Sequence, residues 1–391
     1  MKKIIFLIFS LYLITNINSK AQIVENNNEF AFEIFKQISA SDTLENVFLS
    51  PFSISTALSM AYDGAAGNTA KEMRKVLRFT KDQKFSHNEF TGLLKYYRNS
   101  KQQVFKTVNA AFAQEKYNFL QSYLNLLKNY DAIIKTVDFR DAQKREIARR
   151  EMNKWVSENT EKKIEELIDK NSIDDLTRLV LINAIYFKAD WKYKFDETQT
   201  RQMIFQSKKR QYITAFMHMR ENISFYQSDK LIAMALNYAD DLATLYVIMP
   251  VDENIDDFAS SFSYKNFVSL KSELKSTKID FFIPKIKIES RYKLKEVLMK
   301  MGMVEAFTSK ANFKKMNGRS DLMIDDVIHQ AFIETDENGT EAAAATAVVV
   351  REKSAPQIIY VNFNKPFIFV IQENNKGSIL FIGKFIKPFQ E

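Results

Sequence analysis

Helical spacing of apolar residues marks the first half of the chain. It predicts a helix over residues 30–38, with one face formed by Phe30, Ile34, Phe35 and Ile38. A second helix is expected after Ser50, because Pro51 suits the first position of a helix. Its apolar face would consist of Ile54, Leu58 and Ala61. A third helix is predicted over about residues 144–168, with the apolar anchors Ile147, Trp155, Ile164 and Leu167.

Short apolar runs dominate the second half and are typical of buried strands. They cover residues 180–187, 242–249, 278–283, 327–335, 358–363, 367–371 and 378–386. The last two are joined by the turn-forming sequence Asn374-Asn375-Lys376-Gly377. Because helices come mainly first and strands mainly later, the pattern predicts an α+β fold and not alternating βαβ units. One continuous domain from about residue 25 to 388 is the simplest interpretation.

The N-terminus has the order of features of a secretory signal peptide. Lys2 and Lys3 precede an apolar run over residues 4–14, and small residues follow at the end of the segment. We therefore expect residues 1–21 to be a signal peptide, cleaved after Ser19 or Ala21, and the protein to be secreted and extracellular. The apolar run is short for a membrane span, so a retained anchor is the less favoured alternative.

Composition excludes several classes of chemistry. Loss of the signal peptide removes three lysines and lowers the formal net charge from +8 to +5, a mildly basic balance that does not suggest a nucleic-acid partner. The chain has no cysteine, so thiol catalysis, thiolate metal sites and disulfides are excluded. No HExxH, GxSxG, GxGxxG or P-loop pattern occurs. A serine hydrolase triad stays an alternative, but His329 in an apolar strand is better explained as a hydrogen-bonded core residue.

Two surface features suit a secreted protein. Asn222-Ile-Ser and Asn338-Gly-Thr are acceptor sequences for glycosylation, and Asn222 is the plainer one. Arg145 and Arg149 would share a helix face. An ordinary solvated face is the favoured interpretation, and a polyanion site, for example for a glycosaminoglycan, is the alternative. The basic clusters are Lys144/Arg145/Arg149/Arg150, Lys208/Lys209/Arg210 and Lys314/Lys315.

Residues 337–350 are hard to explain as ordinary structure. An Ala-rich helix is one interpretation, but Thr346 and the valines after it favour a strand. In a strand, one face would carry the small residues Thr340, Ala342, Ala344 and Thr346, and the other Glu341, Ala343 and Ala345. Such a strand could enter a sheet with little steric obstruction. A polar segment follows it, Arg351-Glu352-Lys353-Ser354-Ala355-Pro356.

These residues resemble the serpin family, and the similarity covers nearly the whole mature chain. The segment from Glu337 to Thr346 is similar to the family's proximal hinge. Other segments resemble further motifs of the family and occur in the family's order. They are residues 46–55, 183–191, 284–285, 294–307, 366–367 and 379–384. The departures are Ala189 where the family usually has Gly, Gln330 where it usually has Lys, and Asn364-Lys365 where Asp-His is frequent. None of them falls on the small face of the hinge.

The resemblance implies a serpin domain over residues 22–391, with three β-sheets, about nine helices and an exposed reactive-centre loop at about 337–357. It also implies a suicide-type mechanism. The target protease is acylated by the loop, the cleaved loop inserts into the central sheet, and the acyl-enzyme is trapped. No enzymatic activity, cofactor, metal or membrane association is expected, and a monomer is expected.

Site residues follow from the resemblance, residue by residue. The polar shutter below the sheet opening maps to Ser50, Ser53, Asn183 and His329, the breach to Trp191, and a salt bridge at the hinge to Lys285 and Glu337. Counting fourteen positions from the hinge glycine, Gly339, places the reactive bond at Lys353–Ser354, with Arg351 as the alternative bait. A lysine bait implies a trypsin-like target. A non-inhibitory serpin acting as carrier, chaperone or protease substrate is the alternative function, although the hinge lacks the bulky, charged or Pro residues typical of such members.

Overall fold

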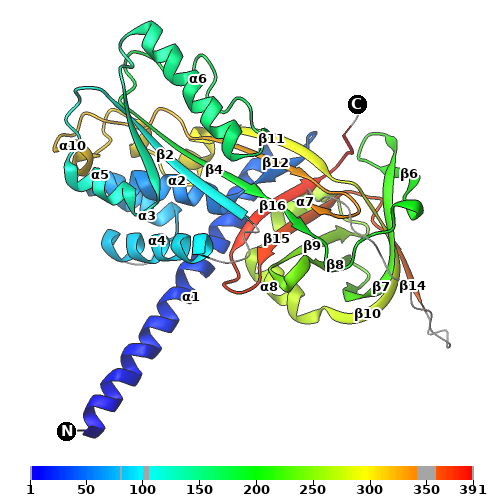
Figure 1. The fold of residues 1–391 in the computed structure, drawn as a ribbon. Coiled ribbons are helices and arrows are strands. Elements are labelled where there is room, and N and C mark those ends of the chain that lie inside the picture. The colour runs from blue at the N-terminus through cyan, green and yellow to red at the C-terminus, as the bar shows by residue number, and fades with distance from the viewer. Residues whose placement is uncertain (1, 80–81, 100–104, 341–357, 390–391) are drawn as a thin grey trace.

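The computed structural model describes residues 2–79, 82–99, 105–340 and 358–389, with side chains from Gln22 onward apart from those of residues 105–108 and 186. Within these ranges the chain forms ten α-helices and sixteen β-strands (Figure 1). The predicted α+β class is confirmed. No helix of the described residues is both long and apolar enough to cross a membrane.

The helices lie mainly in the first half, as the apolar spacing predicted. Their bounds are α1 Lys2–Ser41, α2 Pro51–Gly64, α3 Gly67–Val76, α4 Gln83–Asn99, α5 Gln121–Lys128, α6 Ala142–Asn159, α7 Ile255–Ser261, α8 Tyr264–Glu273, α9 Lys295–Lys300 and α10 Lys314–Asn317. Pro51 opens α2, and the Ser50 side chain caps the helix by accepting a bond from the Ser53 backbone N–H.

The third predicted helix is shorter than expected. α6 ends at Asn159, because Glu161 and Lys162 adopt φ values of 50° and 61°, in the left-handed region that ends a right-handed helix. Ile164 and Leu167 are nevertheless buried, since an irregular segment packs them against the side of α6 that faces the core. The prediction of a helix to residue 168 was therefore wrong, although its apolar anchors beyond residue 160 are core residues.

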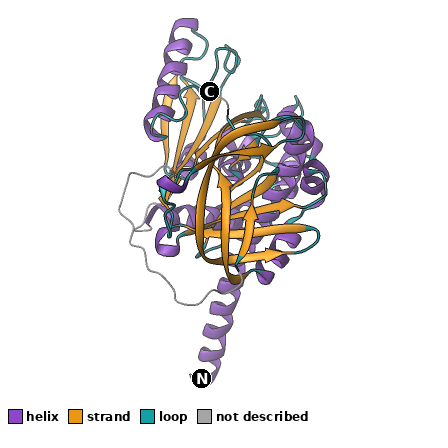
Figure 2. Ribbon diagram, turned by 90° about the vertical axis from the view of Figure 1, so that its right-hand side faces the viewer, coloured by secondary structure: helices purple, strands orange, loops and turns teal. Residues whose placement is uncertain are grey.

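The strands form one large sheet and several small ones (Figure 2). Their bounds are β1 Val47–Leu49, β2 Phe105–Gln114, β3 Ala132–Val137, β4 Leu179–Phe187, β5 Ala189–Asp190, β6 Arg201–Gln206, β7 Gln211–Gln227, β8 Leu231–Asn237, β9 Ala243–Pro250, β10 Lys275–Pro284, β11 Lys287–Lys293, β12 Ile328–Glu334, β13 Gly339–Thr340, β14 Ile359–Asn362, β15 Phe367–Glu373 and β16 Ile379–Phe385. The large sheet has nine strands in the order β1-β16-β15-β9-β8-β7-β10-β14, with β6 also paired to β7.

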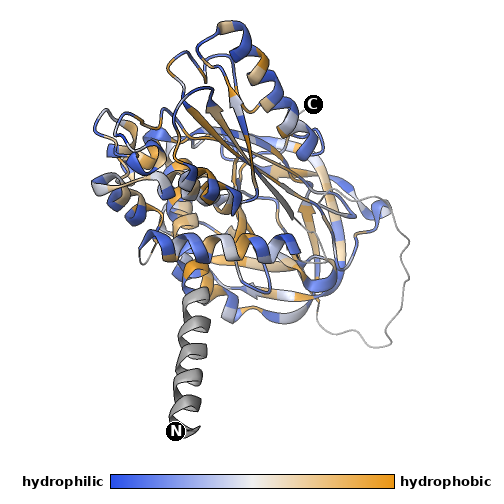
Figure 3. Ribbon diagram, turned by 60° about the vertical axis from the view of Figure 1, so that its left-hand side comes forward, coloured by the Kyte–Doolittle hydropathy of each residue, from blue (hydrophilic) through white to orange (hydrophobic). Residues whose placement is uncertain are grey.

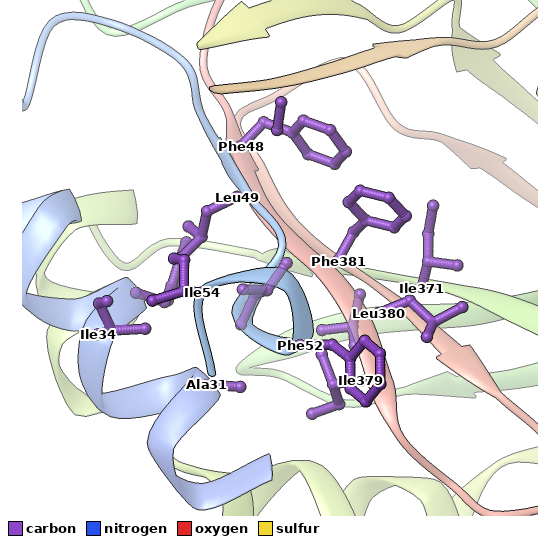
Figure 4. Close-up of a cluster of buried hydrophobic side chains, with 14 of the residues drawn as sticks. Ala31, Ile34, Phe48, Leu49, Phe52, Ile54, Ile371, Ile379, Leu380 and Phe381 are labelled. Carbon is purple, nitrogen blue, oxygen red and sulfur yellow. The ribbon is translucent and has the colours of Figure 1, made fainter. Parts of the chain in front are cut away.

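The main core lies between the large sheet and the helices α1 and α2. β15 and β16 are buried along their whole length, so they show no alternation of apolar and polar residues. Figure 4 shows how side chains of α1, β1, α2, β15 and β16 meet there, among them Ile34, Phe48, Phe52, Ile371 and Phe381. The outer helices are largely hydrophilic, whereas the strands between them are largely hydrophobic (Figure 3).

Three small sheets complete the described structure: β3-β2-β4, β11-β12 and β13-β5. A second apolar cluster lies between α6 and the three-stranded sheet, built from residues such as Met152, Val156, Phe112 and Ile182. The resemblance implied three sheets, and the ladders of the described residues separate into four. The strands β4 and β12, which border the hinge, belong to two different small sheets.

Candidate functional site at the hinge and the sheet opening

β4 and β12 lie in contact but share no ladder in the described residues. β4 pairs with β2, and β12 pairs with β11. Beyond their C-terminal ends, β13 fills the position between them. Gly339 lies opposite Asp190 and Thr340 opposite Ala189, while Thr340 also forms an antiparallel bridge with Thr335. The chain therefore enters between the two strands at the hinge.

Gly339 is required by a close approach of two backbones. A Cβ atom at this position would lie 2.2 Å from the carbonyl oxygen of Ala189 and 2.7 Å from the Cα atom of Asp190. Both are backbone atoms, so no side-chain rotation can relieve the contact. Any larger residue would push β13 away from β5.

Thr340 is the first residue of the predicted small face, and it already points inward. It is 2% exposed, and its hydroxyl lies 2.8 Å from the hydroxyl of Tyr238. Burial raises the pKa of Tyr238, and the contact with Thr340 opposes that rise only in part, so the phenol stays protonated. The inward direction of Thr340 agrees with the period-two pattern deduced for the segment.

Trp191 holds the turn that leads into β13. Its ring stacks on Tyr238, with centroids 4.6 Å apart. Its Nε1–H donates to the carbonyl of Asp336, and its backbone N–H donates to the carbonyl of Asn338, both at 2.8 Å. These bonds tie the backbone of residues 336–338 to Trp191.

The ion pair expected between Lys285 and Glu337 is formed in the structure. Lys285 Nζ lies 2.7 Å from Glu337 Oε2, and the Thr200 hydroxyl donates to Oε1 at 2.6 Å. Burial acts to raise the pKa of the Glu337 carboxyl, but the bonds from Lys285 and Thr200 outweigh it and hold that pKa below its usual value. Glu337 is therefore ionised at neutral pH and fixes the start of the hinge.

The four residues assigned to the shutter are joined in space. The Ser50 backbone N–H donates to His329 Nε2 at 3.0 Å, and the Ser53 hydroxyl donates to Asn183 Oδ1. Burial lowers the pKa of His329 to about 3, so the ring is neutral at physiological pH. Because Nε2 already accepts a backbone bond, His329 is not placed to act as the base of a serine hydrolase.

Comparison with known proteins identifies the architecture. Residues 25–388 match the sequence profile of the family described as Serpin (serine protease inhibitor). The chain belongs to the serpin family. It is 37% identical to the leukocyte elastase inhibitor of Xenopus laevis, over 92% of this chain and 97% of that protein, and 34% identical to human serpin B8, over 93% and 99%.

Solved serpin structures share the fold over most of the chain. A cleaved serpin 42Da gives a TM-score of 0.85 at 27% identity and covers 95% of this chain and 100% of that one. Human thyroxine-binding globulin complexed with thyroxine gives a TM-score of 0.86 at 26% identity, with the same coverage. Proteins similar to this serpin thus include one named as an elastase inhibitor and one named as a thyroxine-binding globulin.

Several predicted residues of the serpin lie outside the described part. These are the hinge residues from Glu341 to Thr346, the reactive bond Lys353–Ser354 and the alternative bait Arg351. Asn222 is exposed on β7, as a glycan acceptor must be, whereas Asn338 is only partly exposed.

The arginines of the basic cluster on α6 are bonded to acidic side chains and to the backbone. The side chain of Arg149 is 8% exposed, and its guanidinium pairs with Glu146 and Glu166. Arg150 also pairs with Glu146, and Arg145 donates to the backbone carbonyl of Phe139. Much of the charge on this face of the serpin is therefore already balanced.

Sequence reasoning missed Tyr238, Thr200 and Asn109, which bond to the assigned site residues Thr340, Glu337 and Asn183. No local pattern distinguishes them. Tyr238 merely follows the apolar strand β8, and Thr200 lies in a polar turn. Their partners are far away along the chain, so only the tertiary fold identifies them.

Proposed function

We propose that this serpin is a secreted suicide-type inhibitor of trypsin-like serine proteases. The observation that carries the proposal is β13, because Thr340 is already paired with neighbours on both sides, Ala189 and Thr335. The loop that follows thus begins in the position of a new strand, and the small residues Ala342, Ala344 and Thr346 can follow Thr340 inward.

The pairing of β13 also predicts where an inserted strand would lie. Thr340 is opposite Ala189 on one side and Thr335 on the other. If both antiparallel pairings continue for six more residues along an inserted strand, Thr346 comes to lie opposite Asn183 on one side and His329 on the other. A small hydroxyl residue would therefore enter the polar shutter, a match that favours insertion.

Insertion would supply the driving force for trapping a protease. Each backbone hydrogen bond gained by the new strand contributes about 0.5–1.5 kcal/mol net. A strand of residues 341–350 between β4 and β12 would gain bonds on both edges and bury alanine and valine side chains. The sum is large enough to make the step after cleavage irreversible.

Lys353 is the proposed bait residue, fourteen positions after Gly339. A lysine side chain fits a specificity pocket with a carboxylate at its floor, and Ser354 is small enough for the position after the cut. Arg351 would suit the same class of protease if the loop were used in a different register.

A gel assay with trypsin tests the proposal. We expect a complex that survives SDS, a cut between Lys353 and Ser354 by mass spectrometry, and a sharp rise in melting temperature after cleavage. Cleavage without a complex and without that rise would indicate the non-inhibitory function, for which the similarity to thyroxine-binding globulin is the supporting observation. Turnover of an ester substrate by the protein alone would instead indicate an enzyme.

Secretion and surface modification belong to the same proposal. N-terminal sequencing of the exported protein should show removal of residues 1–19 or 1–21. Glycosidase treatment should shift the wild-type protein on a gel but not Asn222→Gln. A second shift in the wild type that is absent from Asn338→Gln would show that Asn338 at the hinge also carries a glycan. Inhibition rates with and without heparin test the glycosaminoglycan partner, and light scattering tests the expected monomer.

A further inference from the structure

A buried carboxylate near the end of α2 lies outside the hinge and the shutter described above. Asp63 Oδ2 lies 2.5 Å from Nδ1 of His87 and accepts a bond from the Tyr130 hydroxyl at 2.8 Å. The second ring nitrogen of His87, Nε2, lies 2.9 Å from Nδ2 of Asn129. The side chains of His87 and Asp63 are only 6% and 3% exposed. A polar group this deep is costly unless it is bonded, so His87 and Tyr130, the two partners of Asp63, are fixed in position.

Tyr130 links this cluster to the sheet. Its backbone carbonyl accepts a bond from Asn109 Nδ2 on β2 at 2.7 Å. Asn109 Oδ1 in turn accepts from Asn183 Nδ2 on β4, also at 2.7 Å. Asn183 Oδ1 is bonded to the hydroxyl of Ser53.

The bonds form a closed circuit that begins and ends on one helix. Ser53 stands in the first turn of α2 and Asp63 in the last, ten residues or about 15 Å apart along the axis. Between them the circuit passes through β4, β2 and the turn after α5, and both β4 and α5 pack against α2. The three-stranded sheet is therefore fastened to α2 at two points.

This sheet carries β4, one of the two strands between which the loop would insert. To admit a whole strand, β4 must separate from β12, and the three-stranded sheet must shift over α2. A shift of this kind strains or breaks hydrogen bonds between the sheet and the helix, and bonds to a buried carboxylate are among the strongest.

We propose that Asp63, His87 and Tyr130 are positioning residues that latch the three-stranded sheet to α2 and so limit how fast a strand enters between β4 and β12. The inference rests on the proposed function, since it concerns the same insertion. The latch acts on the uncleaved protein and retards opening of the sheet.

The test compares two tyrosines that both bond to α2. Tyr130 and Tyr123 are each 1% exposed, and the Tyr123 hydroxyl donates to the carbonyl of Met60 at 3.1 Å, outside the circuit. Tyr130→Phe and Tyr123→Phe thus remove one buried hydroxyl each with the ring retained. The probe is a synthetic peptide with the sequence of residues 340–350, and its rate of annealing to the uncleaved protein is followed by native gel and by the rise in melting temperature.

We expect the peptide to anneal about tenfold faster to Tyr130→Phe than to wild type, which corresponds to about 1.4 kcal/mol, and within about twofold of wild type to Tyr123→Phe. Equal acceleration by both substitutions at equal loss of stability would reduce Tyr130 to an ordinary core residue and overturn the latch. A wild-type protein that does not anneal the peptide at all would instead refute the insertion mechanism, and the latch with it.

A double-mutant cycle checks that the circuit acts as one unit. Ser53→Ala opens the circuit at its other end, far from Tyr130 along α2. Distant independent sites give additive effects, so separate roles predict that the two accelerations multiply. A single circuit predicts that Ser53→Ala/Tyr130→Phe anneals the peptide about as fast as the faster single variant. Multiplication of the two effects would contradict the closed circuit.

Discussion

Replacing Thr340 with arginine should convert the protein from an inhibitor into a substrate of trypsin. Thr340 is 2% exposed beneath β13, with its hydroxyl against Tyr238. An arginine there must either bury a guanidinium without a carboxylate partner, at a cost of several kcal/mol, or push β13 out of its place between Ala189 and Thr335. Both outcomes retard insertion of the strand that follows.

The magnitude follows from a competition between two rates. Insertion of the cleaved loop competes with deacylation of the protease, and each 1.4 kcal/mol or so added to the insertion barrier shifts that competition about tenfold. A barrier raised by about 3 kcal/mol therefore leaves only about one encounter in a hundred trapped, if the two rates were equal at the start. Titration of trypsin gives the stoichiometry of inhibition, and a gel separates cleaved protein from the complex. We expect Thr340→Arg to be cleaved at Lys353 and to release active trypsin.

Two control variants separate the position of the charge from its presence. Thr340→Val keeps the shape and removes only the contact with Tyr238, worth about 1 kcal/mol, so it should retain most inhibition. Glu341→Arg places the same cation one residue later, on the outward face that the alternation predicts. Equal loss of inhibition in Glu341→Arg and Thr340→Arg would refute the assignment of Thr340, Ala342, Ala344 and Thr346 to the buried face.

Three further predictions concern the bait, the shutter and the hinge. Lys353→Glu should abolish trypsin inhibition, because it sets a carboxylate against the carboxylate of the specificity pocket. If trypsin cuts the wild-type loop after Arg351 instead, the assignment of Lys353 as the bait residue would be wrong. The pKa of His329 is lowered from 6.5 to about 3, so the unfolded chain takes up the proton first as the pH falls. The free energy of unfolding should then fall by about 1.4 kcal/mol per pH unit from about pH 6 toward 3. Urea unfolding at several pH values should show that this free energy depends less steeply on pH in His329→Gln than in the wild type. The pKa of the Glu337 carboxyl is lowered in the folded protein. Its ionised form therefore stabilises the fold at neutral pH, and this stabilisation is lost in acid as the pH falls through the lowered pKa. Lys285→Ala should therefore lower the melting temperature of the uncleaved protein at pH 7, and the difference from wild type should vanish in acid; a difference independent of pH would argue against the ion pair.

Local sequence was enough for the elements that depend on near neighbours. The apolar spacing after Phe30 placed the C-terminal part of α1, which begins as early as Lys2, and the cap and proline at Ser50 and Pro51 placed the start of α2, because these signals act within one or two helical turns. The apolar runs placed β4, β9, β10, β12, β15 and β16 to within a few residues. The same reasoning failed at the end of α6, where apolar positions continued past Glu161 while the backbone turned away.

The hinge shows where local information ends. Alternation of small residues from Thr340 onward predicts a strand that can be buried, and the structure bears this out at Thr340 itself. No local pattern could show that Thr340 contacts Tyr238, which lies 102 positions earlier in the chain. Nor could it show that Glu337 accepts a bond from Thr200, 137 positions earlier. The reactive bond at Lys353 came from a count along a resemblance and stays a prediction.

The sequence by itself determined the α+β class, the position of several helices and strands, which face of the hinge is small, and which family the chain resembles. The tertiary structure decided which polar groups meet: the circuit from Ser53 through Asn183 and Asn109 to Tyr130 and Asp63 joins α2 to the strands β4 and β2 and to the turn after α5, which are far apart in the chain. The reason is that periodicity records only how each residue relates to its near neighbours, whereas a buried polar atom is satisfied by whatever group the whole topology brings within about 3 Å of it.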